Sequence, residues 1–202
     1  MFATHQPIIG TAMRASPSGL ARGVVFVLAT IQVKFPDAVR ETQRYCTTGE
    51  LHPMAFFGAK LRGVAWINQN AEKLFTDLRN ADEPVGQAKL FKRLKLFREI
   101  PGIGITKAGF LCQLRDGTIG CLDVHNKKRF GIATRRYDHA SDERTYEYIG
   151  ECFKCGGPET LWNEWCELIG TKYGMPAEKI SEMHLAAVGP YTHLTEAAIP
   201  PR

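Results

Sequence analysis

One short segment of the chain combines residue types that could bind an anion beside a reactive group. The sequence IPGIG at 100–104 is followed directly by ITKA at 105–108. The two glycines permit a tight turn of the backbone, and the residues after them favour a helix. The first amides of a new helix have no partner inside it, and such amides bind phosphate. The spacing therefore predicts a phosphate-binding turn between two helices.

A lone carboxylate follows this turn in an apolar setting. Asp123 lies between Leu122 and Val124, 17 residues after Thr106. A carboxylate that is fixed and only partly solvated can stabilise developing positive charge or take a proton from a nucleophile. Asp is also a favoured N-cap residue, so Asp123 could simply begin a helix at Val124. The two roles are compatible, because a capping aspartate is held in place by its own helix.

Together, the turn and the aspartate resemble the helix-hairpin-helix DNA glycosylase superfamily. The resemblance covers residues 88–131, and the flanking helices more loosely. In this superfamily the hairpin holds DNA phosphates, and the aspartate lies beside the sugar of a nucleotide that has flipped out of the duplex. The resemblance implies an all-α, glycosylase-like fold, double-stranded DNA as the partner and a catalytic role for Asp123. The hairpin residues expected to contact DNA are Gly102, Ile103, Gly104, Thr106 and Lys107.

The chain departs from the superfamily at one position that decides the type of reaction. Members that also cut the DNA strand carry a Schiff-base lysine at the position that matches Thr106 here. In this chain the lysine comes one residue later, at Lys107, and one helical step turns a side chain by about 100°. The resemblance thus implies a monofunctional glycosylase that uses water, with Lys107 on a phosphate. A one-residue bulge would instead make Lys107 the nucleophile, so Lys107 remains a second candidate catalytic residue.

Four polar residues after the aspartate are candidates for DNA contact. His125 could bind a phosphate or tune Asp123, and the alternative is an imidazole on the helix surface. Asn126 could hydrogen-bond DNA or cap a turn, and the sequence decides neither. Lys127 and Arg129 extend the positive charge along the same segment.

Two other functions fit the same motif. Bacteriophage proteins that attach amino-acid or polyamine groups to pre-modified thymine resemble glycosylases in fold, so this chain could be such a transferase. It could also be a non-catalytic DNA-binding module that uses the hairpin only for phosphate contact. Asp123 discriminates against that second alternative, because a simple binder has no need of the carboxylate.

The composition is consistent with a polyanionic partner. The chain has 202 residues, of which 44% are hydrophobic, and a net charge of +5. Its cations gather on either side of the hairpin, which favours nucleic acid over a merely solvated helix face. These basic residues are Lys89, Lys92, Arg93, Lys95, Arg98, Lys128, Arg135 and Arg136, beside those already named. No run approaches the length of a membrane span, so we expect no membrane contact. The six cysteines, most of them in helical apolar patterns, are typical of reduced thiols in a cytoplasmic protein, and we expect a monomer.

The cysteines suggest buried thiols more than a metal site. Some members of the superfamily hold an iron–sulfur cluster with four cysteines, but the spacing here does not match that pattern. Cys152, Cys155, Cys166 and His184 could supply four zinc ligands, although Cys166 lies in an apolar helical context. We therefore expect neither a metal nor a cofactor.

Several aromatic residues could stack on a flipped base, and the three tryptophans, Trp66, Trp162 and Trp165, are among them. Trp162 and Trp165 recur with Leu and Ile at helical spacing, which is more typical of a core. Phe56, Phe57 and Met54 lie in a less periodic stretch and could also reach a base. The sequence does not identify the pocket that would read the base.

The periodicity predicts an all-α fold. Residues 1–18 are expected to be an irregular N-terminal arm, 19–190 a helical domain with the motif at 88–131, and 191–202 a flexible tail. Helices are predicted over about 19–33 with Ser18 as cap, 36–46, 53–62, 63–80, from Pro84, 105–115, 124–130, 141–154 with Ser141 as cap, from Pro158, and from Pro176.

Overall fold

A computed structural model describes residues 1–81, 86–138 and 140–190 of the chain. Over these residues the protein forms ten α-helices and no strand, which confirms the all-α class. The helices are α1 (Phe2–Ala15), α2 (Pro17–Ala29), α3 (Phe35–Thr48), α4 (Ala59–Asn80), α5 (Gln87–Arg98), α6 (Ile105–Asp116), α7 (Val124–Arg129), α8 (Asp142–Lys154), α9 (Gly157–Tyr173) and α10 (Ala177–Val188). The predicted tail at 191–202 lies outside the described residues.

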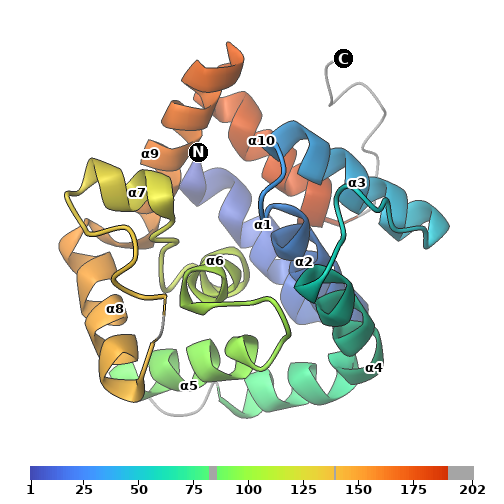
Figure 1. Cartoon of the computed structure of the whole chain (residues 1–202), viewed down its shortest axis with the longest axis horizontal. Coiled ribbons are helices and arrows are strands. Elements are labelled where there is room, and N and C mark those ends of the chain that lie inside the picture. Colours follow the sequence, from blue (N-terminus) through green and yellow to red (C-terminus); the bar gives the residue numbers. More distant parts are fainter. Residues whose placement is uncertain (82–85, 139, 191–202) are drawn as a thin grey trace.

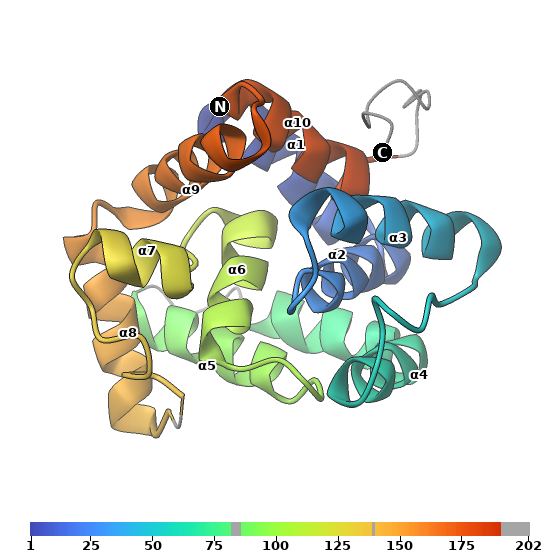
Figure 2. The same cartoon turned by 45° about the horizontal axis from the view of Figure 1, so that its top comes forward.

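Helix α6 lies at the centre of the molecule, with the other helices arranged around it (Figure 1). It packs against α1, α2 and α5, and most of its side chains are buried. A helix buried on nearly all sides is a core element. Figure 2, in which the view is turned by 45°, again shows α6 with α7 and α8 on one side and α2 on the other. The predicted anion-binding turn therefore leads into a helix that is buried along most of its length.

The prediction of an irregular N-terminal arm is wrong, because residues 2–15 form helix α1. The buried face of α1 consists of Gln6, Ile9, Gly10 and Met13, which recur at helical spacing. Two of these four residues are not large apolar side chains, so the hydrophobic pattern is weak. Gly10 is needed for packing: a Cβ there would come within 2.6 Å of the Arg115 carbonyl oxygen on α6.

Helix α2 begins two residues earlier than predicted, and its cap is Ser16 in place of Ser18. The Ser16 hydroxyl accepts a hydrogen bond from the Gly19 amide at 3.1 Å. The helix ends at Ala29, before the predicted Val33, and Gln32 follows with a φ of +57°. Among the described residues, Gln32 is the only non-glycine with positive φ, and such backbone is often found at functional sites. The turn redirects the chain into α3.

Helix α4 replaces the two helices predicted over 53–62 and 63–80. Residues 53–58 form turns, and one helix runs from Ala59 to Asn80. Gly63, at the expected break, lies inside this helix. A Cβ at Gly63 would come within 2.4 Å of the Pro101 carbonyl oxygen. This glycine therefore marks the close approach of α4 to the hairpin turn.

Candidate active-site cleft

The hairpin turn between α5 and α6 is anchored by apolar residues and leaves its glycines exposed. Ile100 and Ile103 are buried, and the Ile103 amide donates to the Ile100 carbonyl at 3.0 Å. Gly102 has a φ of +87°, which a residue with a Cβ resists. Gly104 is the N-cap of α6 and has no side chain to satisfy the first amides of the helix. The geometry is that of an open helix start able to accept an anion.

Asp123 is the N-cap of α7, as predicted, and is held at both carboxylate oxygens. Its Oδ1 accepts hydrogen bonds from the amides of His125 at 3.0 Å and Asn126 at 2.9 Å. Its Oδ2 accepts from the indole Nε1 of Trp165 at 2.9 Å. The carboxylate is half-buried, so it is fixed but still reachable by solvent. The interaction with Trp165 joins two helices that are 42 residues apart in sequence.

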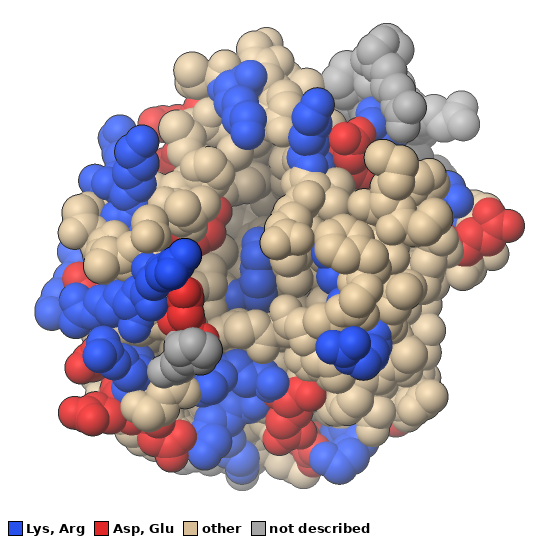
Figure 3. All heavy atoms as spheres, in the orientation of Figure 1, with Lys and Arg blue, Asp and Glu red and all other residues tan. Residues whose placement is uncertain are grey.

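A cavity of about 690 Å³ brings Asp123 and the first turn of α6 together. Its walls come from the α2–α3 link, α6, the segment around Asp123, α9 and α10. Figure 3 shows a hollow in this face of the molecule, with Lys and Arg side chains around it and inside it. We call this cavity the cleft. Both candidate catalytic residues, Asp123 and Lys107, line it.

Lys107 extends into the cleft. Its Nζ donates a hydrogen bond to the Thr30 hydroxyl at 3.1 Å and lies 5.6 Å from the centre of the Phe110 ring. The neighbouring Thr106 also lines the cleft, and its hydroxyl donates to the Leu122 carbonyl at 3.4 Å. The lysine amine therefore lies in the same cavity as the carboxylate, whereas the sequence favoured a contact between Lys107 and a DNA phosphate.

The residues that follow Asp123 divide into buried and accessible ones. Asn126 is 2% exposed, and its amide donates to the carbonyls of Cys121 and Leu161. Lys127 is 4% exposed and donates to the Thr134 carbonyl at 2.8 Å; burial lowers the pKa of its amine. Their burial argues against the predicted DNA contacts. His125 lines the cleft half-buried, and Arg129 is exposed and pairs with Glu164 at 2.8 Å.

The basic cluster on α5 is partly committed to contacts within the protein. Arg93 is 4% exposed and pairs with the buried Asp116 at 3.4 Å. Arg98 donates to the Ala140 carbonyl at 2.7 Å, and Lys95 pairs with Asp142. These side chains join α5 to the rest of the protein. Among residues 1–81, 86–138 and 140–190, the exposed cations that line the cleft are Lys34 and Lys172, neither of which the sequence singled out.

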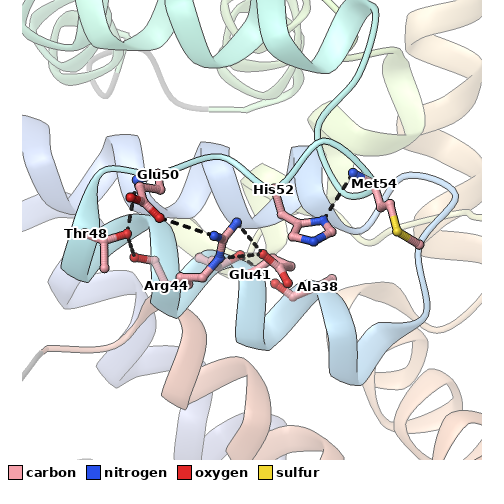
Figure 4. A network of polar contacts seen from close by, with 8 residues as sticks. Ala38, Glu41, Arg44, Thr48, Glu50, His52 and Met54 are labelled. Atoms are coloured by element: carbon pink, nitrogen blue, oxygen red, sulfur yellow. Dashed lines mark hydrogen bonds and ion pairs between the residues drawn. The ribbon is translucent and has the colours of Figure 1, made fainter.

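The loop after α3 supports the hairpin from the other side. Arg44 on α3 pairs with Glu41 at 2.9 Å and Glu50 at 3.6 Å, which ties the start of the loop to the helix (Figure 4). Helix α4 begins directly after the loop, at Ala59, whose carbonyl oxygen would lie 3.2 Å from a Cβ at Gly102. Met54 is 79% exposed on this loop, but it does not line the cleft.

The sequence did not identify the inner wall of the cleft, which is aromatic. Trp162 and Trp165 belong both to the core and to this wall. His184, considered above only as a zinc ligand, lies among their rings: its centroid is 4.4 Å from that of Trp162 and 5.2 Å from that of Trp165. The only sequence signal for this wall was the spacing of Trp162 and Trp165 along α9. The other two rings come from separate helices, His184 from α10 and Phe35 from α3.

No group of three or more His, Cys, Asp or Glu side chains in the described part of the chain could hold a metal ion. Cys152 and Cys166 are fully buried. No helix within residues 1–81, 86–138 and 140–190 is long and apolar enough to cross a bilayer. Comparisons of the chain with known protein families, with curated proteins and with solved structures find no match.

Proposed function

We propose that this protein is an enzyme of the helix-hairpin-helix glycosylase type, which hydrolyses the N-glycosidic bond of a modified or damaged nucleotide flipped out of double-stranded DNA. The observation that carries the proposal is that a fixed carboxylate, Asp123, and the open start of α6 border one cleft. The hairpin amides would hold a phosphate, and the flipped nucleotide would enter the cleft beside Asp123.

The hydrogen bonds of Asp123 suit it to this reaction. When the bond between C1′ and the base breaks, its electron pair leaves with the base and positive charge develops on the sugar. The Asp123 carboxylate stabilises that charge and accepts a proton from the water that attacks C1′. Oδ2 accepts one hydrogen bond, from Trp165, which leaves an acceptor position for the water. The proton taken from the water is passed on to the departing base, so the products are a free base and an intact strand with an abasic site.

Accessible cations near the cleft support binding of the DNA backbone. Lys34 and Lys172 line the cleft and are exposed, and Lys128 and Arg129 project from α7 beside it. Contacts of this kind position the duplex without reading its sequence. Specificity would then come from the base inside the cleft.

A specific observation favours a second candidate, transfer of an amine-bearing group onto a pre-modified thymine. The Lys107 amine lies inside the cleft. A cation there opposes the positive sugar of glycosidic cleavage, but it attracts an anionic leaving group displaced from a modified base. On this alternative Asp123 would accept a proton from the attacking amine.

The decisive experiment is incubation with duplex oligonucleotides that each bear one modified base, followed by mass spectrometry. Loss of a base with an intact abasic strand, abolished in Asp123→Asn, supports the glycosylase. Gain of mass supports the transferase. Binding of DNA with no change in any oligonucleotide would mark a non-catalytic binder, and failure to bind DNA would contradict all three functions.

A further inference from the structure

The deep end of the cleft is a cage of aromatic rings around His184. The imidazole centroid lies 4.7 Å from that of Phe35 and 5.9 Å from that of Phe110. His184 itself is 1% exposed and lines the cleft. Such rings offer flat apolar faces against which a heterocycle can stack. The cage walls that line the cleft are Phe35, Phe110, Trp162, Trp165 and His184.

The protonation of His184 follows from its surroundings. Nδ1 lies 2.9 Å from the Ile180 carbonyl oxygen, which can only accept, so Nδ1 carries the hydrogen. Burial lowers the pKa of His184 to about 3, although the hydrogen bond to Ile180 opposes this shift. The ring is therefore neutral at pH 7, and Nε2 presents a lone pair.

The His184 Nε2 lone pair has no hydrogen-bond partner among the described residues. The other polar atoms of the cage are engaged: Trp165 Nε1 donates to Asp123, and Trp162 Nε1 donates to Ser181 Oγ at 3.1 Å. Buried acceptors without a partner are rare in folded proteins, and each calls for an explanation. A ligand that donates one hydrogen bond would provide it.

We propose that this cage binds the flipped base, and that it takes an oxo-base whose ring nitrogen carries a hydrogen, donated to His184 Nε2. The proposal rests on the proposed function for the source of the base. The ligand must donate a hydrogen bond because His184 Nε2 presents a lone pair, which can only accept one. The oxo group follows from another polar group that lines the cleft: the Lys107 amine, which lies 5.6 Å from the centre of the Phe110 ring, can donate to a carbonyl next to that ring N–H. Uracil and thymine derivatives have this pattern.

Free nucleosides test the cage without DNA or turnover. Uridine and 5-methyluridine carry the N3–H, whereas 3-methyluridine has a methyl group in its place. Stacking on Trp162 and Trp165 should quench tryptophan fluorescence. We expect uridine and 5-methyluridine to bind, and 3-methyluridine to bind about 10- to 100-fold more weakly, since it leaves the acceptor unpaired. 5-Methyluridine carries its methyl group on C5 and keeps the N3–H, so it controls for the added size of 3-methyluridine.

Two variants and one spectroscopic measurement complete the test. His184→Phe keeps an aromatic ring but has no acceptor, so it should lose the preference against 3-methyluridine. Trp66→Phe changes a tryptophan outside the cleft and should keep both the quenching and the preference. Should His184→Phe fail to fold, the ¹⁵N resonance of His184 Nε2 in the unaltered protein answers the same question. It should shift with uridine and not with 3-methyluridine.

The outcomes separate this inference from the proposed function. Equal binding of all three nucleosides, or no binding of any, overturns the cage proposal even if bases are excised from DNA. A preference that depends on His184 supports the cage even if the oligonucleotide panel shows no excision, in which case the proposed reaction alone fails.

Discussion

Asp123 accepts three hydrogen bonds, two from the amides of its own helix and one from Trp165. The amide bonds make it a helix cap, which the sequence indicated. The indole bond orients the second oxygen within the cleft, and no sequence pattern pointed to it. The structural role of Asp123 and its proposed catalytic role therefore belong to one side chain, and a substitution must be chosen to separate them.

Asp123→Asn is expected to remove activity and largely to spare DNA binding. The Asn oxygen can still cap α7, but the amide does not stabilise positive charge or accept a proton. The expected loss in turnover is about 100- to 10,000-fold. The Asn NH₂ would face the indole N–H of Trp165, donor against donor, which should cost about 1–3 kcal/mol of stability.

Trp165→Phe provides the control for this substitution, because it removes the indole donor and leaves the carboxylate in place. In that background, Asp123→Asn should cost less stability but the same loss of turnover. Thermal unfolding and single-turnover kinetics of the four proteins measure both quantities. Wild-type turnover in Asp123→Asn would reduce Asp123 to a helix cap.

Lys107 decides whether the reaction proceeds through water or through a protein amine. With Thr106 at the position that matches the Schiff-base lysine, we expect water to be the nucleophile. Borohydride should then trap no covalent protein–DNA complex, and the strand should break only after alkali or heat. The Lys107 amine does lie in the cleft, so a trapped complex that disappears in Lys107→Ala would identify it as the nucleophile.

At the scale of elements, the two hairpin glycines have different tasks. Gly102 has a positive φ and lies against Ala59, so both its backbone and its surroundings require glycine. Gly104 has a φ of −82° and a ψ of 176°, which any residue adopts, and a Cβ there meets no atom within 4 Å. Only a ligand would require Gly104 to lack a side chain.

Gly102→Val should therefore destabilise the protein by about 1–3 kcal/mol, because it strains the backbone. Gly104→Val should lose less stability, about 1 kcal/mol for the poorer N-cap residue, but it should bind DNA more weakly, because its side chain blocks approach to the α6 amides. Melting temperature and affinity, measured side by side, distinguish the two effects. Undiminished DNA binding by a folded Gly104→Val variant would refute the phosphate contact.

Helix α4 begins with a buried amine that should make stability depend on pH. Lys60 is 3% exposed, and its Nζ donates to the Ala55 carbonyl at 2.6 Å. Burial, with a smaller effect of Lys107, lowers the pKa of Lys60 from 10.5 to about 8. Between these two values the unfolded chain binds more protons than the folded one, so stability from this group rises with pH.

Lys60→Met tests this dependence, because Met keeps the length of the side chain and removes the amine. The stability of the unaltered protein relative to Lys60→Met should increase from pH 8 to about 10.5 and stay level below pH 8. Urea unfolding of both proteins across this pH range measures the difference in stability. Because both proteins contain the same cysteines and tyrosines, the titration of those groups cancels in the difference. A constant difference would show that Lys60 is charged and solvated in the folded state.

At the scale of the whole molecule, the net charge of +5 and the cations beside the cleft predict DNA binding that weakens steeply with salt. The logarithm of affinity should fall against the logarithm of salt concentration with a slope of about −0.9 for each phosphate contacted. Binding should show little dependence on the sequence around the target base.

Lys34→Gln and Lys172→Gln should each reduce that slope by about 1. Lys73→Gln is the matched control, since Lys73 is exposed on α4, pairs with Asp77 and does not line the cleft. Filter binding or anisotropy at several salt concentrations provides the slopes. A salt-independent affinity would contradict the proposed phosphate interface.

The sequence by itself determined the features that depend on a few neighbouring residues. These include the all-α class, the turn between α5 and α6, and the caps of α7 by Asp123 and of α8 by Ser141. Capping and turn formation are decided within about four residues, so local residue types suffice. The same reasoning missed α1, whose buried face includes Gln6 and Gly10, because polar and small residues at close helix crossings carry no hydrophobic signal.

Only the tertiary structure decided which side chains share the cleft. Asp123 lies beside Trp165, and His184 among the rings of Trp162 and Phe35, because separate helices pack together there. The burial of a side chain and the direction in which it points are set by such long-range packing. Asn126 lies inside the protein and Lys107 extends into the cavity for this reason. These contacts also leave Nε2 of His184 without a hydrogen-bond partner among the residues that the structure describes.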